Sequence, residues 1–159
     1  MKILIIFATR YGTTEKCAQM LGGILKEKGH DVDILDLKKN RRVDPGYYDI
    51  AVIGGSFLMG RMNSIVRRFV ARNLKKLLDM KTGVFMCGAD EKWEKEIKKG
   101  FPEDLLESAA AKGYFGYEML WDRMSPFYRS MLQKEYNTTD DVSKIKQDNI
   151  KKFAGDLVT

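Results

Sequence analysis

The opening of the chain constrains the fold more than any other segment. A continuous apolar run, Ile3 to Ala8, stops at Thr9, and a short loop of hydroxyl side chains and a glycine follows. Apolar residues then recur at helical spacing, at Cys17, Leu21, Ile24 and Leu25. This pattern predicts a buried strand, a tight loop and the N-terminus of a helix.

The predicted loop, Thr9 to Thr14, has the chemistry of an anion site. The first backbone N–H groups of a helix have no partner inside the helix, and the helix dipole adds partial positive charge there. The hydroxyls of Thr9, Thr13 and Thr14 can donate to an anion, and Gly12 lets the backbone approach it closely. We predict that the loop holds one phosphate group, although a polar turn with a capping threonine would show a similar pattern.

Other nucleotide sites are excluded by spacing. The loop has no G-x-x-x-x-G-K-[ST] sequence, which argues against a Walker-type site. It also has no G-x-G-x-x-G sequence, which argues against dinucleotide binding.

Composition indicates a globular protein with one domain, residues 1–159. The hydrophobic fraction is 44% and the charged fraction 31%, and no apolar run is long enough to span a bilayer. We expect a cytoplasmic protein with reduced thiols, because Cys17 and Cys87 lie on different predicted elements and no targeting segment is visible.

The formal net charge is +6, with basic clusters such as Lys38 to Arg42. No nucleic-acid motif accompanies this charge, so we expect no nucleic-acid partner. Solvated helix faces, acidic partners and an anionic membrane surface are the alternatives that remain.

Strand and helix patterns alternate along the chain. The predicted strands are Ile3 to Ala8, Val32 to Leu37, Ile50 to Gly54, Gly83 to Cys87 and Tyr114 to Leu120. Four helices are predicted. The first follows Thr14, the second extends from Ile65 to Leu78, and the third covers 91–111 with an interruption at Gly100-Phe101-Pro102. The last follows a cap at Thr139 or Asp140 and includes Val142 and Ile145. Gly29 is expected to end the first helix, and Lys112-Gly113 to close the third.

This alternation predicts an α/β three-layer sandwich with a doubly wound, five-stranded parallel sheet of order 2-1-3-4-5. Ligands of such sheets bind at the carboxyl ends of the strands. Three loops are therefore expected to meet there: Thr9 to Thr14, Gly54 to Met62 and Cys87 to Trp93.

The three loops resemble those of the flavodoxin family. Thr9-Arg10-Tyr11-Gly12-Thr13-Thr14 is similar to the phosphate loop [TS]-x-T-G-x-T, with Tyr11 in place of a threonine. Cys87 to Trp93 is similar to G-x-G-D-x-x-Y, with Ala89 in place of a glycine and Trp93 in place of the tyrosine. The resemblance implies a non-covalent FMN whose phosphate lies on the first loop and whose ring lies between the other two.

The cofactor-binding residues implied by this resemblance come from all three loops. They are Thr9, Arg10, Tyr11, Gly12, Thr13, Thr14, Gly55, Ser56, Phe57, Leu58, Met59, Gly60, Cys87, Gly88, Ala89, Asp90 and Trp93. Phe57 is expected to line the ring site, whereas Trp93 could equally anchor a helix in the core. Cys87 could be no more than a small buried hydrophobe.

A second resemblance is to the menaquinone-dependent protoporphyrinogen oxidases. Val52 to Ser64 is similar to their V-I-G-A-S-I-x-x-G-x-x-x-S segment, and Trp121 to Met124 to their W-Y-D-R-F stretch. Those enzymes are also basic, whereas ordinary flavodoxins are acidic. The segment Trp121 to Tyr136 exceeds what a minimal flavodoxin needs, and it could pack on the sheet edge or dock a partner, quinone or membrane.

Other chemistries have little support. His30, the only histidine, is expected at the edge of the sheet opposite the site, which argues against histidine-based catalysis. One histidine and two distant cysteines make no metal-ligand cluster. Two functions therefore compete: an FMN-binding electron carrier for redox partner proteins, and a flavin-dependent oxidoreductase of the quinone-dependent protoporphyrinogen oxidase type.

Overall fold

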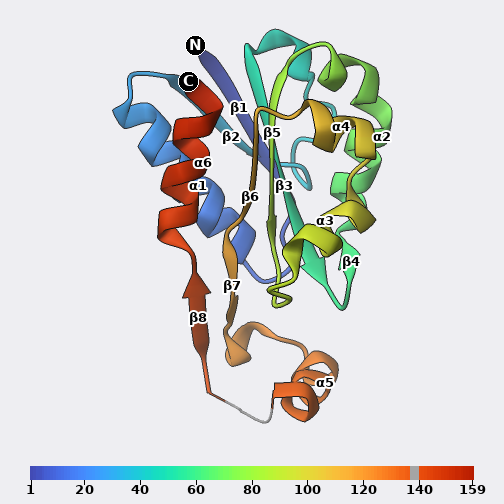
Figure 1. The fold of residues 1–159 in the computed structure, drawn as a ribbon. Coiled ribbons are helices and arrows are strands. Elements are labelled where there is room, and N and C mark those ends of the chain that lie inside the picture. Colours follow the sequence, from blue (N-terminus) through green and yellow to red (C-terminus); the bar gives the residue numbers. More distant parts are fainter. Residues whose placement is uncertain (137–139) are drawn as a thin grey trace.

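The computed structural model describes residues 1–136 and 140–159. Within these residues the main sheet contains five parallel strands in the order β2-β1-β3-β5-β6, which confirms the predicted topology (Figure 1). These strands are β1 (Lys2–Phe7), β2 (Asp31–Asp36), β3 (Ile50–Leu58), β5 (Lys81–Cys87) and β6 (Ala111–Tyr114). A short antiparallel strand, β4 (Arg61–Met62), pairs with the end of β3.

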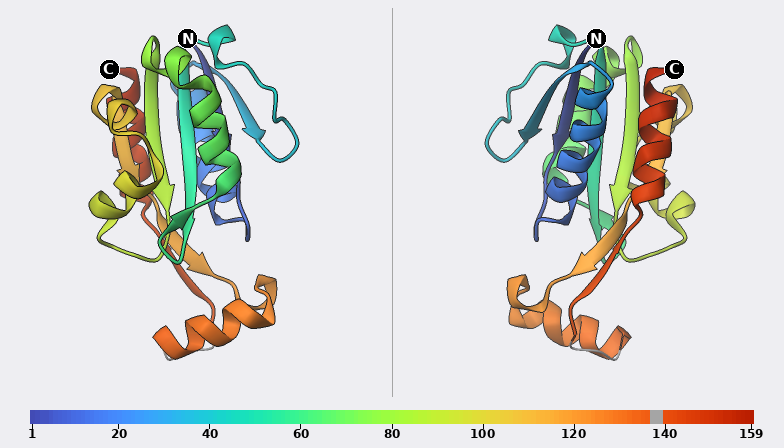
Figure 2. Two further views of the ribbon diagram at one scale, coloured as in Figure 1. Left: turned by 90° about the vertical axis from the view of Figure 1, so that its right-hand side faces the viewer. Right: turned by 90° about the vertical axis from the view of Figure 1, so that its left-hand side faces the viewer.

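Helices cover both faces of the sheet, as the two edge views in Figure 2 show. On one face lie α1 (Thr13–Glu27) and α6 (Gln147–Val158), and on the other α2 (Ser64–Leu78), α3 (Trp93–Gly100) and α4 (Glu103–Ser108). This arrangement confirms the predicted α/β sandwich.

The core divides into two halves because successive strand residues point to opposite faces. Ile3 and Ile5 of β1 pack with α1 and α6, whereas Leu4 and Ile6 pack with α2 and the short helices. All four side chains are fully buried. The continuous apolar strands in the sequence are therefore strands covered on both sides.

Helix α1 ends as the sequence predicts. Gly29 has a φ of 91°, and its N–H donates to the Lys26 carbonyl at 2.9 Å. The His30 N–H donates to the Leu25 carbonyl at 3.2 Å. These two bonds form a Schellman motif, in which a glycine tolerates the left-handed backbone.

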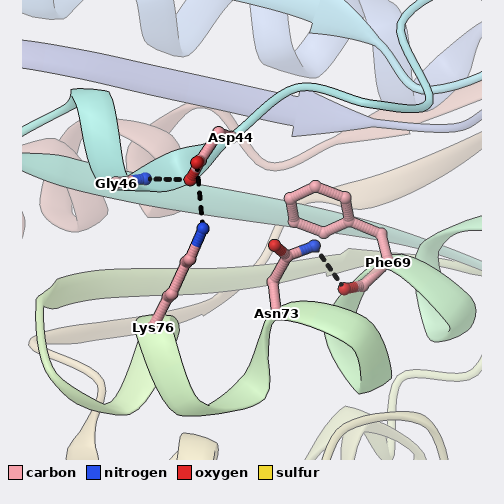
Figure 3. Close-up of polar contacts among 5 residues, drawn as sticks. All are labelled: Asp44, Gly46, Phe69, Asn73 and Lys76. Carbon is pink, nitrogen blue, oxygen red and sulfur yellow. Dashed lines mark hydrogen bonds and ion pairs between the residues drawn. The ribbon is translucent and has the colours of Figure 1, made fainter.

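The basic loop between β2 and β3 is anchored on α2. It contains a 3-10 turn, η1 (Pro45–Tyr47), capped by Asp44, whose carboxylate accepts from the Gly46 N–H at 2.8 Å. The same carboxylate accepts from Lys76 Nζ at 2.9 Å, and the Lys76 contact, followed by the Gly46 hydrogen bond, lowers the pKa of Asp44 (Figure 3). On the same helix, the Asn73 amide donates to the Phe69 carbonyl at 3.0 Å.

A projecting arm follows β6, and we call its described residues, 116–136 and 140–145, the arm. It consists of β7 (Gly116–Met119), the 3-10 turn η2 (Trp121–Arg123), α5 (Pro126–Tyr136) and β8 (Val142–Ile145). Strands β7 and β8 pair antiparallel, and α5 lies at the far end, beyond the carboxyl ends of the parallel strands (Figures 1 and 2).

Three predictions near the arm were wrong. The single strand predicted from Tyr114 to Leu120 is two strands in different sheets, because Gly116 turns the chain with a φ of 89°. Lys112-Gly113 lies within β6 instead of closing a helix. Val142 and Ile145 belong to β8, so the last helix begins at Gln147; the alternative cap Thr139 lies outside the described residues.

No helix in the described ranges has the length and apolar character needed to cross a membrane.

Candidate functional site

A cavity of about 500 Å³ lies where the carboxyl ends of β1, β3 and β5 meet the arm. The three loops selected from the sequence all reach it, which is the position expected for a ligand of a doubly wound sheet. Its walls comprise Thr9, Arg10, Tyr11, Thr13, Thr14, Ser56, Phe57, Leu58, Met59, Gly60, Met86, Cys87, Gly88, Ala89, Asp90, Glu91, Glu96, Tyr117, Glu118, Met119, Met124, Leu132 and Glu135.

The loop between β1 and α1 is preformed. Gly12 is the N-cap of α1 with a φ of 96°, and its N–H donates to Thr9 Oγ1 at 2.9 Å. Thr9 therefore shapes the loop with its side chain. Gly12 itself is not part of the cavity wall, so its contribution is the left-handed turn that aims the next residues at the cavity.

Thr14 carries an unsatisfied hydroxyl at this site. The residue is 1% exposed and lines the cavity, and its Oγ1 forms no hydrogen bond of ordinary geometry with any described residue. The first-turn N–H groups of α1 have no partner within the helix either. Buried polar atoms are normally paired, so this combination of donors fits a bound anion.

The second loop is the β3–β4 hairpin. Leu58 pairs with Arg61, and the two residues between them, Met59 and Gly60, have φ values of 52° and 77°. Positive φ at both positions is characteristic of a type I′ turn, and it is strained for Met59 because a side chain opposes that backbone. The Met59 side chain is 49% exposed at the cavity rim.

The third loop is held by hydrogen bonds to Gly88. Its N–H donates to the Gly116 carbonyl at 3.0 Å, and its carbonyl accepts from the Tyr114 hydroxyl at 2.6 Å. Burial, followed by the charge of Glu91, raises the pKa of Tyr114, so that hydroxyl stays protonated and keeps donating. Asp90 caps the next turn by accepting from the Lys92 N–H at 2.9 Å.

Cys87 presents a neutral thiol to the cavity. The adjacent Cys17 thiol and burial raise its pKa well above the ordinary value, and the nearby Thr14 hydroxyl acts in the opposite direction. Both cysteines are buried and reduced. A protonated, enclosed thiol is a poor nucleophile, so Cys87 serves as a compact wall residue.

Not every residue implied by the resemblance reaches the cavity with its side chain. Phe57 does line the cavity, and its ring also packs on Phe101, 6.4 Å between centroids, whereas Gly55 and Trp93 are absent from the wall. Gly55 faces the core, where a Cβ would lie 2.9 Å from Met62 Sδ. Trp93 is outside the cavity wall, with its ring parallel to that of Tyr114 at 6.4 Å.

The arm supplies the part of the wall that sequence reasoning missed. Met119, Trp121, Met124 and Leu132 form a small apolar cluster that also contacts Tyr11 and Ala89 of the site loops. The long segment after the fifth predicted strand was a sign of additional structure, but its spacing did not show that it covers the site. The described residues contain no group of His, Cys, Asp and Glu side chains that could hold a metal ion.

A family model for the flavodoxin domain matches residues 4–146. The chain belongs to this flavodoxin-domain family. The match includes every predicted site residue and the whole of the arm, which confirms the resemblance found from the sequence.

Known proteins agree with this membership. The protoporphyrinogen IX dehydrogenase [quinone] of Escherichia coli K12 is 33% identical over 85 residues, covering 54% of this chain and 47% of that protein. The chain therefore matches about half the length of that curated relative.

Two solved flavodoxins share the fold. The flavodoxin of Streptococcus pneumoniae TIGR4 superposes with a TM-score of 0.60 over 99% of this chain and 97% of its own, at 19% identity. A short-chain flavodoxin associated with a bacterial microcompartment gives a TM-score of 0.61 over the same shares, at 16% identity.

Proposed function

We propose that this flavodoxin-domain protein binds one FMN per chain and transfers electrons between redox partners. Membership of the family supports FMN as the cofactor. The observation that carries the proposal is the buried, unpartnered Thr14 hydroxyl at the N-terminus of α1.

The three loops divide the work of binding. The phosphate would receive donors from Thr13, Thr14 and the first-turn N–H groups of α1. The flavin ring would lie between the β3–β4 hairpin and the Gly88 loop, where Met59 and Ala89 supply apolar contact. When bound, the flavin supplies one- or two-electron transfer, and the chain positions it and limits its contact with water.

Spectroscopy of the purified protein tests this proposal directly. We expect flavin absorption bands, and release of FMN rather than FAD on denaturation. A colourless protein that fails to quench the fluorescence of added FMN would contradict FMN binding.

A second candidate function is a flavin-dependent oxidoreductase that uses a quinone and oxidises a porphyrinogen. The 33% identity with the Escherichia coli dehydrogenase favours it. So does the exposed Phe127 of α5, at 67%, since an apolar side chain there could contact a membrane surface. In this case the protein would be cytoplasmic and peripheral to the inner membrane face.

Two assays separate the candidates. If the protein is the oxidoreductase, the flavin-loaded protein should oxidise protoporphyrinogen in a menaquinone-dependent reaction. The Phe127→Ser variant should then bind anionic vesicles less than the parent protein does. The electron carrier requires neither, but it requires reduction by a flavoprotein reductase and reoxidation by a partner protein.

A further inference from the structure

Arg123 of the arm reaches the loop between β1 and α1. A Cβ placed on Gly12 would lie 3.1 Å from Arg123 Nη1, so the guanidinium lies directly against the N-cap of α1. Arg123 follows β7 in the 3-10 turn η2, far from this loop in sequence. The way the arm folds back places its charge there.

Several other contacts hold the arm against the same loop. Arg10 Nη1 donates to the Tyr128 hydroxyl at 2.8 Å, and the Tyr11 ring meets the Tyr128 ring edge-on at 6.1 Å. Lys16 Nζ lies 3.1 Å from Glu118 Oε2, which joins α1 to β7. The position of Arg123 is therefore part of a continuous contact between arm and loop.

The other positively charged side chains near the loop each contact another residue of the protein. Arg10 contacts Tyr128, Lys16 pairs with Glu118, and Lys38 Nζ donates to the Thr9 carbonyl. Arg123, by contrast, has no ion pair or side-chain hydrogen bond with any residue in the ranges 1–136 and 140–159. An exposed guanidinium with no side-chain partner, lying against Gly12 two residues before Thr14, is suited to a phosphate, which accepts two parallel N–H bonds from arginine.

We propose that Arg123 is a phosphate-binding residue and that it ties the arm down over the bound cofactor. This inference rests on the proposed FMN function. It adds to Arg10 of the Thr9–Thr14 motif a second positive side chain that comes from outside the motif, and it makes the contact between arm and loop depend on the cofactor phosphate.

Parallel titrations with FMN and riboflavin test the proposal, because riboflavin has the same ring and no phosphate. Arg123→Gln removes a charged donor to a charged acceptor, so the dissociation constant for FMN should rise about tenfold to a hundredfold. That for riboflavin should change less than twofold. Arg123→Lys should lie between, because it retains the charge without the bidentate geometry.

Lys134→Gln is the matched control, since it removes one positive charge from an exposed position on the same arm. It should leave both affinities near those of the parent protein. The Arg123→Gln variant should also show a shallower dependence of log Kd for FMN on log salt concentration.

Hydrogen exchange tests the tie between phosphate and arm without relying on affinity. FMN should slow the exchange of the β7 amides of Tyr117 to Met119 in the parent protein, and riboflavin should slow them less. Arg123→Gln should remove this difference between the two ligands.

The outcomes are distinguishable from failure of the proposed function. If the parent protein binds neither FMN nor riboflavin, both proposals fail. If the parent binds FMN tightly and Arg123→Gln binds it equally well, only the role of Arg123 is overturned. Equal losses for FMN and riboflavin would also overturn it, because they would show that Arg123 acts through arm packing.

Discussion

Two threonine hydroxyls are buried without a hydrogen-bond partner in the described ranges, and their positions differ. Thr14 lines the cavity, whereas Thr82 lies near the start of β5, at the opposite end of the sheet. An unsatisfied buried hydroxyl costs about 1–3 kcal/mol of stability. At Thr14 this cost is explained by a ligand that supplies the missing partner; nothing in the structure explains it at Thr82.

Thr14→Val should therefore separate stability from binding. Valine keeps the branched shape and removes the hydroxyl, so the cofactor-free protein should gain roughly 1 kcal/mol in its free energy of unfolding. Loss of a donor to a charged phosphate should weaken FMN binding about tenfold to a hundredfold and leave riboflavin binding nearly unchanged. Urea denaturation and fluorescence titration measure the two effects.

Thr82→Val is the control for that prediction. It should give a similar gain in stability with no change in the affinity for FMN. If both variants lose FMN affinity to the same degree, Thr14 does not contact the phosphate.

At the scale of single residues, the sequence predicted where the backbone needs a special conformation, but it did not predict which way side chains point. The cap and turn at Gly12 follow from local chemistry, because a left-handed residue favours glycine. The ring of Trp93 could lie at the site or in the core, and its packing against Tyr114, outside the cavity wall, decides between these. Arg123 could not be assigned to the site, because its position depends on how the arm folds back.

At the scale of the elements, two glycines in and just after helix α1 have opposite effects on stability. Gly23 is helical and exposed, and a Cβ there would contact nothing within 4 Å. Gly29 also has open space around it, but its φ is 91°. Gly23→Ala should therefore stabilise the protein by about 0.4–1 kcal/mol through the unfolded chain, and Gly29→Ala should destabilise it by roughly 1–2 kcal/mol. Thermal or urea unfolding of the two variants gives the signs, and a shared sign would contradict the assigned cap.

The arm should depend on its own small core. Leu132 of α5 is 4% exposed, whereas Phe127 of the same helix is 67% exposed. Leu132→Ala should reduce the stability of the closed arm by roughly 2–5 kcal/mol and speed hydrogen exchange in β7 and β8. Phe127→Ala should change it by less than about 0.5 kcal/mol.

Amides in β1, β3 and β5 serve as the internal control for both variants. They should exchange at the parent rate, because the arm cluster is separate from the two halves of the sheet core. Equal acceleration in arm and sheet would show that the two unfold together.

The elements that the sequence predicted well are those with a clear period. Continuous apolar runs identified β1, β3 and β5, and the spacing from Ile65 to Leu78 identified α2. Val142 and Ile145 are spaced as on a helix yet belong to a strand, because their pairing with β7 overrides a short local pattern. The break at Gly116 depends on the return strand, since a Cβ there would lie 2.0 Å from the Lys144 carbonyl oxygen.

For the whole molecule, FMN should act as a stabilising ligand. A ligand that binds only the folded state adds roughly 2.7 kcal/mol at about one hundred times its dissociation constant. For a chain of this size, that corresponds to about 5–11 °C in Tm. Melting curves of the cofactor-free protein with FMN, riboflavin and no addition measure the effect, and FMN should exceed riboflavin at equal concentration. An unchanged Tm with excess FMN would contradict specific binding.

The root of the arm also has a consequence for how the chain folds. Gly116 pairs with Ile145, and the Lys146 N–H donates to the Phe115 carbonyl at 2.9 Å, so the arm leaves and returns at one point. Helix α6 follows the arm in the sequence, so the two ends of the arm must come together before Phe153 can pack on Phe85 and Phe115. Closing a flexible loop costs entropy that grows with its length. Pairing of β7 with β8 shortens the loop that must close. If these two strands pair early in folding, α6 should dock on the sheet faster.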